Sequence, residues 1–528
     1  PAKPLTLDLS LRPEGRGLAF QARSAEGDGL RLNVDGAVPD LDHPLAVDAA
    51  VDLHLPSLAW LGAWAPGGRV PDLPLTARGR LQNQQQGSRL DDVRLEMGGV
   101  QVALSGTLGR PPEADGEPGT GPSQRLRFDL ELQAGAADAS VLEQWVAAPL
   151  PPDPFSLGLQ LAGNPQAFEV SAIDVRLGRS RAGGDLSVTL GEPRRLSGRI
   201  QASLLDVAFW RGQPQGETQA PDEKERADPR GFVFDDTPVA GLVDYGVELD
   251  LQLGADEIDL GNTQIHEVAA ALELQGQRLD LTAFSLRGSK GGRLTARASM
   301  DGSGSVPQLS LVLDGKDLRL GLAAGPDQEL TTYPTTEVHI ALTGAGATRR
   351  ALASGLDGQL RLYSGPGQVA SSSVTLLFSD FLTELFSTLN PFAEKSAYTQ
   401  LDCTVAAVDI VAGQAAVGPL VAQTREITIL SEGKLDLRTE QIDLSFNTKA
   451  RTGLGITTGV LINPLIKVGG SLAQPAIEFD PARAVVSGST AVATAGLSLL
   501  AKGFSDRFLS SKDPCGDARK EIAGRKAP

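Results

Sequence analysis

Apolar and polar residues alternate along most of this 528-residue chain. Residues 125–133 read Arg-Leu-Arg-Phe-Asp-Leu-Glu-Leu-Gln, and residues 247–253 also place an apolar side chain at every second position. Because successive side chains of a β-strand point to opposite faces, a period of two predicts strands with one apolar and one polar face. The same alternation recurs at 93–108, 279–286, 307–320, 358–362 and 435–446.

A loose internal repeat accompanies this alternation. Residues 87–109, 170–205 and 282–314 each contain a strand pattern, a glycine-bearing turn, a second strand pattern, a Gly or Pro break and a third strand pattern. Loops of two to five residues join antiparallel neighbours, whereas parallel strands need long crossover connections. The sequence therefore predicts an antiparallel meander and a mainly β fold.

Two inserts rich in Pro, Gly and charged residues interrupt the pattern, at 110–124 and 211–230. Such composition is typical of loops and linkers, and the second insert is a candidate domain boundary. The chain is accordingly divided into β repeats at 1–210, a loop at 211–230, a second β region at 231–480, a helix at 481–511 and a tail at 512–528.

Three segments have helical features. Residues 138–147 begin with Asp138, a candidate N-cap. Residues 372–389 repeat apolar side chains at helical spacing and end before Asn390-Pro391. The third segment, 481–509, contains an uncharged run rich in Ala, Ser, Thr and Gly. This composition favours a helix packed on protein or lying on a membrane surface over a membrane span.

Composition supports the all-β interpretation and narrows the partners. The chain has 60 Gly and 34 Pro, as expected for many short strands joined by turns, and only 5 % aromatic residues. Its net charge of −17 argues against nucleic acid as a partner, because phosphate binding needs a basic surface. Leu, Val and Ala dominate the apolar positions and predict a smooth apolar face.

No catalytic, metal-binding or cofactor-binding pattern emerges from the sequence, so we expect no enzyme and no cofactor. The four histidines (His43, His54, His266 and His339) are scattered and lack ligand spacing. Residues 453–459 contain three glycines, but with the wrong spacing for a dinucleotide fingerprint. The pair Asp235-Asp236 fits a turn or an N-cap better than a catalytic dyad.

Four segments together resemble the AsmA-like family of Gram-negative envelope proteins, the group that also includes TamB and YhdP. The resemblance covers about residues 231–518, and upstream it rests on the style of the repeats. The segments are Phe232–Pro238 (FVFDDTP), 350–367 (RALASGLDGQLRLYSGPG), 380–403 (DFLTELFSTLNPFAEKSAYTQLDC) and 463–480 (NPLIKVGGSLAQPAIEFD).

The resemblance implies an elongated, U-shaped β-groove with a few short helices, located in the periplasm. Its apolar interior would carry phospholipid acyl chains between the inner and outer membranes. It also implies a full-length protein anchored in the inner membrane by an N-terminal segment that precedes residue 1. The alternative function is a structural or assembly factor for outer-membrane proteins, acting with envelope protein partners through an exposed sheet edge.

The alternation supplies candidate residues for such a groove. The candidate lining residues are Leu126, Phe128, Leu130, Leu132, Val247, Leu249, Leu251, Leu253, Leu311, Leu313, Leu360 and Leu362. The candidate groove or membrane helix carries Leu377, Phe378, Phe381, Leu382, Leu385 and Phe386.

The two cysteines, Cys403 and Cys515, form no CxxC pair. From the residues alone, two buried free thiols and one disulfide both remain open. The family resemblance, with its periplasmic location, implies a disulfide between them.

This pairing predicts a result for peptide mass spectrometry. Digestion of the unreduced protein should yield a linked peptide pair containing Cys403 and Cys515. Two thiols that alkylate without prior reduction would contradict the disulfide.

Overall fold

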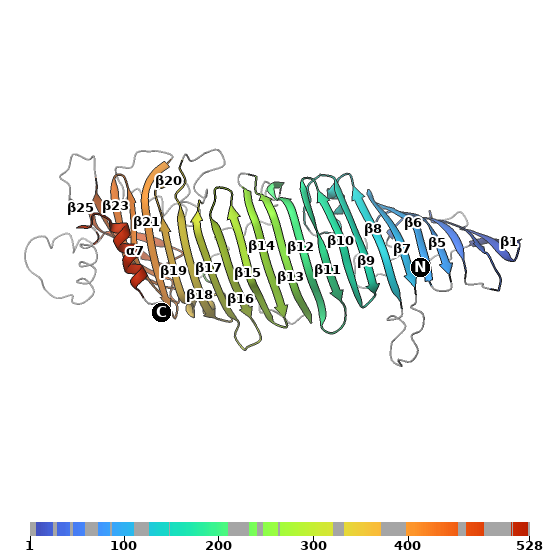
Figure 1. The fold of residues 1–528 in the computed structure, drawn as a ribbon. Coiled ribbons are helices and arrows are strands. Elements are labelled where there is room, and N and C mark those ends of the chain that lie inside the picture. The colour runs from blue at the N-terminus through green and yellow to red at the C-terminus, as the bar shows by residue number, and fades with distance from the viewer. Residues whose placement is uncertain are drawn as a thin grey trace, which may run out of the picture. The chain divides into compact units, whose positions relative to one another are not determined.

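The computed structural model describes residues 7–24, 29–42, 46–58, 72–84, 87–109, 126–146, 148–209, 232–239, 246–261, 264–319, 332–370, 398–451, 461–479, 508 and 510–525. The chain divides into two compact units. Unit 1 comprises Pro1–Gly212 and Gly246–Gly261, and unit 2 comprises Gln213–Tyr245 and Asn262–Pro528. Figure 1 shows the strands in each unit lying side by side in chain order.

Unit 1 is a sheet in which each hairpin adds two antiparallel strands. Its strands in the described residues are β1 (Leu7–Glu14), β2 (Gly17–Ser24), β3 (Arg31–Val38), β4 (Asp48–Leu55), β5 (Leu75–Gln84), β6 (Gly87–Met97), β7 (Val100–Gly109), β8 (Arg127–Ala136), β9 (Phe155–Asn164), β10 (Ala167–Leu177), β11 (Ser180–Thr189), β12 (Arg194–Asp206) and β13 (Val247–Asp259).

One pair departs from the meander that the sequence predicts. Strands β12 and β13 run parallel, with Leu196 opposite Leu249. The long connection between Asp206 and Val247 allows β13 to start at the same edge as β12, which a short hairpin loop could not do.

Unit 2 continues the antiparallel pattern. Strand β21 pairs with β19 along one part of its length and with β20 along another. The described strands are β14 (Gln264–Gln275), β15 (Arg278–Gly288), β16 (Arg293–Asp301), β17 (Gln308–Leu318), β18 (Thr336–Ala345), β19 (Asp357–Ser364), β20 (Gly367–Ala370), β21 (Tyr398–Val411), β22 (Gln414–Thr424), β23 (Ile427–Asp436), β24 (Gln441–Ala450), β25 (Leu461–Gly470) and β26 (Pro475–Phe479).

Neither sheet closes on itself among the described residues. Strand β1 pairs with β2 alone, and all eight of its residues are exposed. Strand β26 pairs with β25 alone. The predicted fold class, a mainly β antiparallel meander left open as a curved sheet with few helices, is confirmed.

The helices only partly match the prediction. Asp138 does cap a helix, accepting a hydrogen bond from Ser140 N at 2.9 Å, but the helix is a single 3₁₀ turn, η3 (Ala139–Leu142). Pro149, Pro151 and Pro152 follow closely and cannot continue a helix. The predicted helices at 372–389 and 481–509 lie outside the described residues, Phe508 excepted.

Helix α7 (Pro514–Gly524) forms in the segment that the sequence suggested was a tail. Asp513 caps it by accepting from Gly516 N at 2.9 Å, and Pro514 occupies the first helical turn. The other described α-helix is α3 (Arg349–Ser354), capped by Thr348. Among the described residues, no helix is long and apolar enough to span a membrane.

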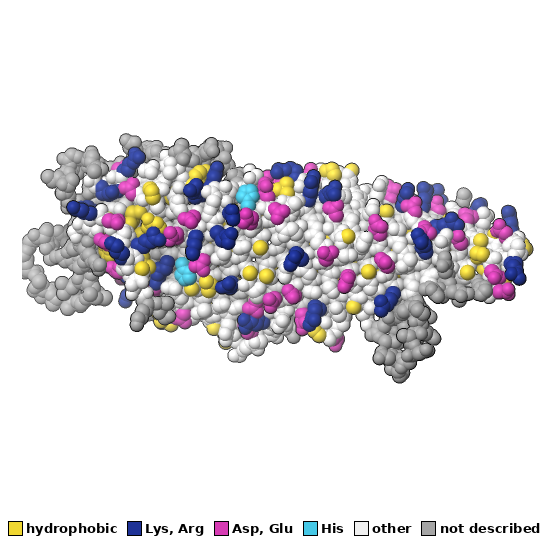
Figure 2. Space-filling view, in the orientation of Figure 1, with side chains coloured by type: hydrophobic (Ala, Val, Ile, Leu, Met, Phe, Trp, Pro, Cys, Tyr) yellow, Lys and Arg dark blue, Asp and Glu magenta, His cyan; other side chains and the backbone are white. Residues whose placement is uncertain are grey.

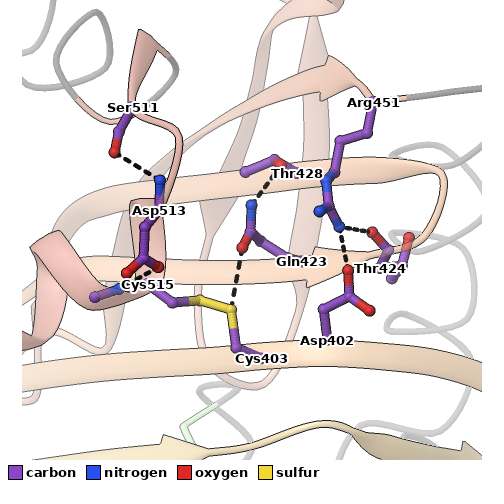
Figure 3. Close-up of a disulfide and its surroundings, with 10 residues drawn as sticks. Asp402, Cys403, Gln423, Thr424, Thr428, Arg451, Ser511, Asp513 and Cys515 are labelled. Atoms are coloured by element: carbon purple, nitrogen blue, oxygen red, sulfur yellow. Dashed lines mark hydrogen bonds and ion pairs between the residues drawn. A yellow bond between two sulfur atoms is a disulfide. The ribbon is translucent and has the colours of Figure 1, made fainter.

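A disulfide fixes α7 to the sheet. Cys403 on β21 is joined to Cys515, with their Cα atoms 6.5 Å apart (Figure 3). Gln423 Oε1 lies 3.2 Å from Cys403 Sγ, and its amide donates to Thr428 Oγ1. The buried apolar side chains packed around the bridge are Val405, Val421, Leu430, Phe508 and Ala518.

The docking of α7 brings two carboxylates together. Partial burial and then the charge of Glu521 on α7 raise the pKa of Glu432 on β23. Because the pKa of Glu432 is higher in the folded protein than in the unfolded chain, its contribution to the free energy of unfolding is fully present at low pH. This contribution is lost as the pH rises through the raised folded-state pKa, where Glu432 becomes charged.

We therefore expect Glu432→Gln to stabilise the protein at pH 7–8 and to have little effect near pH 4. Thermal unfolding across this pH range measures the difference. Asp443→Asn, at an exposed carboxylate on β24, serves as the control and should track the wild type. A Glu432→Gln variant less stable than the wild type at pH 8 would contradict the repulsion.

Candidate functional site

The cross-strand register aligns apolar residues into an unbroken row across unit 1. Directly opposed residues of paired strands share one face of a sheet. The row contains one residue from each strand, β1 to β13, and every member is Gly, Ala, Val, Leu or Phe. In strand order, it is Leu11, Phe20, Gly36, Ala49, Leu81, Leu90, Gly106, Leu130, Leu161, Val170, Leu186, Gly198 and Leu251.

A second row runs beside it on the same face, two residues along each strand. It crosses β7 to β13 and again contains only apolar residues or glycine. Its members are Leu108, Phe128, Gly163, Phe168, Val188, Leu196 and Leu249. The side of each sheet that carries such rows is called the apolar face below.

The apolar face of unit 1 is not covered like an ordinary core. Of the first row only Ala49 is buried, at 6 % exposure, whereas Leu11 is 55 % exposed. The remaining members, Leu130, Leu161 and Leu251 among them, are partly exposed. In a sandwich the inward side chains of both sheets interdigitate and lose contact with solvent. Here most side chains of the rows stay partly exposed, although Leu55 and Leu75 on the same face are buried against Leu58.

Glycines in the rows allow the backbone to bend. Gly106 has φ 138° and Gly198 has φ 143°, a region that residues with a Cβ atom rarely adopt. A Cβ at Gly106 would lie 2.1 Å from Asp129 O, and one at Gly198 would lie 2.2 Å from Asp185 O. Strand-interior glycines of this kind mark tight bends, so they curve the sheet around its apolar face.

The opposite face is polar and carries ion pairs between neighbouring strands. Arg80 Nε lies 2.6 Å from Asp48 Oδ1, and Arg195 Nη2 lies 2.6 Å from Glu248 Oε2. The hydrogen bond from Arg80 holds the pKa of Asp48 below its ordinary value. Figure 2 shows basic and acidic side chains interspersed over the described strands on the face in view. The two faces therefore differ sharply in polarity.

Unit 2 has a comparable row, in which only Val468 near the C-terminal end is buried. Leu313, Ile340 and Leu360 are partly exposed, whereas Val468 is only 3 % exposed. The row runs through Ala270, Phe284, Ala296, Leu313, Ile340, Leu360, Val408, Val417, Gly433, Leu444, Val468 and Ile477.

A closed core adjoins the C-terminal part of this row. Ile427, Ile429, Phe446 and Ile466 pack there with Val468 and are all buried. Two buried hydroxyls in the same strands, Ser431 Oγ and Thr448 Oγ1, have no hydrogen-bond partner among the described residues.

The structure places the predicted lining residues as follows. Leu130 and Leu251 belong to the first row of unit 1, Phe128 and Leu249 to the second, and Leu313 and Leu360 to the row of unit 2. The others that extend the apolar face are Leu132 opposite Leu104, Leu253 opposite Ile200, Leu311 opposite Leu342, and Leu362 opposite Val338.

Two predicted lining residues lie at the margin of the apolar face, and the six residues of the predicted groove or membrane helix cannot be placed. Leu126 precedes β8 and is 40 % exposed, and Val247 opens β13 opposite Arg194. The helical candidates Leu377 to Phe386 lie outside the described residues. The predicted lining residues include none from β9 to β11, although Leu161, Val170 and Leu186 of these strands belong to the first row.

Two of the histidines and the Asp235-Asp236 pair are engaged in contacts with neighbouring side chains. His339 Nδ1 lies 2.7 Å from Asp314 Oδ1, and His54 Nδ1 lies 3.4 Å from Thr76 Oγ1. Asp235 and Asp236 pair with Arg349 and Arg350. In the parts of the chain with assigned positions, no group of three His, Cys, Asp or Glu side chains is placed to hold a metal ion.

No family model, curated protein or solved structure matches the chain. The likeness to AsmA-like proteins therefore remains a prediction from the four sequence segments.

The exposure of the apolar face can be measured with introduced cysteines, since both native cysteines are in the disulfide. Leu130→Cys should react with a maleimide in the native protein, while Phe446→Cys, at a position only 8 % exposed, should react on the order of tenfold more slowly or less. Glu131→Cys, on the polar face of the same strand, gives the rate for full exposure. If Leu130→Cys were as protected as Phe446→Cys, the apolar face would be covered.

Proposed function

We propose that this protein binds phospholipid acyl chains along the apolar face and carries them between the inner and outer membranes of a cell envelope. The observation that carries the proposal is the row of uncharged, partly exposed side chains that continues through every strand of unit 1. A site for one small ligand would need a local cavity with a few convergent polar groups. A row that repeats from strand to strand suits a long, apolar and flexible ligand.

The free energy of binding follows from the chemistry of the face. Each CH₂ group that leaves water contributes about 0.8 kcal/mol, so an acyl chain of ordinary length gains several kcal/mol even when its burial is partial. The polar head group can stay in solvent because the sheet is open. Neighbouring strands are about 4.8 Å apart, so a row across thirteen strands is on the order of 60 Å long.

Movement along the row needs no chemical step. Consecutive members of the row differ mainly in size, and none carries a charge, so successive positions have similar affinities for a methylene chain. A lipid can then exchange between positions without crossing a large barrier. The Cys403–Cys515 disulfide supports a location in an oxidising compartment such as the periplasm.

A second candidate function rests on the edge strand β1. Its leucines are strongly exposed, with Leu7 at 46 % and Leu9 at 62 %. An edge strand with unpaired backbone groups can pair with a strand from another protein. This supports the alternative proposal that the protein helps to assemble outer-membrane proteins.

Lipid binding can be tested with variants of the first row. Native mass spectrometry of the purified protein should detect bound phospholipid, and a photo-crosslinking residue at Leu130 should label it. Leu251→Glu should reduce lipid occupancy strongly, because the lipid would have to bury a carboxylate. Gln252→Glu adds the same charge on the polar face of β13 and should leave occupancy unchanged.

Failure to bind would be equally informative. If the delipidated wild type takes up no phospholipid from vesicles and Leu130 gives no lipid crosslink, acyl-chain carriage is excluded. Ser10→Pro on β1 then tests the alternative. It should abolish assembly activity through the edge strand, while Leu251→Glu in a folded protein should leave that activity intact.

A further inference from the structure

Residues 232–239 form a short strap on unit 2, although the connection to which they belong joins two strands of unit 1. Strands β12 and β13 both lie in unit 1, and the strap lies between them in sequence. Its contacts within unit 2 come from two places, the turn between β23 and β24 and the N-terminal part of α3.

The first attachment is a carboxylate that is buried in the protein. Glu440, in the turn between β23 and β24, is only 1 % exposed. It accepts hydrogen bonds from Val233 N at 2.6 Å and from Phe234 N at 2.7 Å. Each carboxylate oxygen of Glu440 thus accepts one backbone N–H of the strap. The side chain of Glu440 therefore holds the backbone of the strap and does not depend on the identity of any strap side chain.

The second attachment joins the strap to α3. Asp235 O accepts from Arg350 N at 3.0 Å, and Val239 N donates to Ala347 O at 3.0 Å. The guanidinium of Arg350 lies 3.8 Å from the ring centroid of Phe232 and forms an ion pair with Asp236. These contacts are polar and local. When they break, the polar groups that formed them can hydrogen-bond to water.

A single side chain of the strap, Phe234, packs against the apolar face. It contacts a cluster that contains Ile410, Ala415 and Ala353. Ile410 lies opposite Gly358 on β19 and opposite Ala415 on β22, so this cluster lies at one margin of the apolar face of unit 2. Val233, next to Phe234, points away and is 54 % exposed.

We propose that the strap is a gate for acyl chains. When docked, Phe234 occupies the margin of the apolar face beside α3; when released, it leaves that position free for a methylene chain. The gate rests on the proposed lipid function, since its ligand is the same. The strap is held by hydrogen bonds from its backbone to Glu440 and to the segment that opens α3, by the ion pair of Asp236 with Arg350, and by the packing of Phe234. None of these contacts belongs to a strand ladder, so the strap can undock without unfolding the sheet.

Hydrogen–deuterium exchange measures the docking directly in the full chain. Glu440→Gln keeps the size of the side chain but replaces one of the two side-chain oxygens that accept from the strap with an NH₂ donor. Exchange of the Val233 and Phe234 amides should then accelerate by about tenfold or more. Asp436→Asn is the matched control, because Asp436 ends β23 directly before the same turn and pairs with the exposed Arg438. It should leave the exchange rates unchanged.

Uptake of a fluorescent fatty acid by the delipidated protein measures the gate. Glu440→Gln and Phe234→Ala should both increase the initial uptake rate severalfold, because a larger fraction of molecules is competent to bind. The opposite variant fixes the strap in its docked position with a disulfide. Pro238 and Thr348 are opposed in an antiparallel bridge, so Pro238→Cys with Thr348→Cys should form a disulfide and slow uptake below that of Thr348→Cys alone.

The outcomes separate the gate from the lipid function. Faster exchange at Val233 and Phe234 with unchanged uptake in all variants would overturn the gate and leave lipid binding standing. If the Val233 and Phe234 amides exchanged at the same rate in Glu440→Gln as in the wild type, Glu440 would not hold the strap, and the gate would be overturned. If neither the wild type nor any variant takes up the probe, both the lipid function and the gate fail. Faster uptake in the released variants and slower uptake in the locked one would support the gate.

Discussion

The register of the β-strands is the constraint on which the other features of this protein depend. Side chains alternate with a period of two, so a slip of one residue between neighbours would move a strand's whole apolar set to the polar face. Backbone hydrogen bonds hold each strand to the next one, and cross-strand ion pairs such as Arg80 with Asp48 favour the same alignment. The continuous apolar face exists because each pairing from β1 to β13 places apolar residues or glycines opposite one another, also where a β-bulge shifts the register along the strand.

Apolar burial is distributed unevenly between the two units. In unit 2, Ile427, Ile466 and Val468 are almost fully buried, and the disulfide adds a covalent link between β21 and α7. In unit 1 the large side chains of the rows remain partly exposed, so each contributes less than a fully buried residue would. Among the described residues, unit 1 has one buried cluster, around Leu55, Leu58 and Leu75, whereas unit 2 has three. We infer that the hydrogen-bonded ladder contributes a larger share of the stability in unit 1 than in unit 2. Local opening should therefore be easier in unit 1.

The alternation in the sequence predicted the fold class, and it also indicated which residues share the apolar face; that they line a lipid groove stays a prediction. Alternation in β8 and β13 is almost uninterrupted, so Leu130 and Leu251 were recognisable from the printed residues alone. The bulge in β10 between Val170 and Ile173 shifts the period and hid that strand's part in the row. Glycines such as Gly198 could not be recognised from the sequence as members of the row, because their role depends on a backbone angle.

Other features depend on tertiary contacts that have no local signal. The parallel pairing of β13 with β12 requires a choice of partner after a long connection, and no short-range pattern encodes it. Glu440 looks like an ordinary turn carboxylate until the structure places Val233 and Phe234 against it. Helix α7 is short and polar, and it is held by the disulfide and the buried Phe508 more than by helical periodicity.

The hairpin architecture has a consequence for how such a chain can change its length. Each hairpin contributes two members to the row, and each new member needs only to be apolar and in register. Duplicating a hairpin would extend the row by about 10 Å without repacking a globular core. The number of hairpins therefore sets the length of the row. Adding or removing repeats would change the length of the row, while each repeat stays free to vary in sequence as long as it keeps an apolar residue in register.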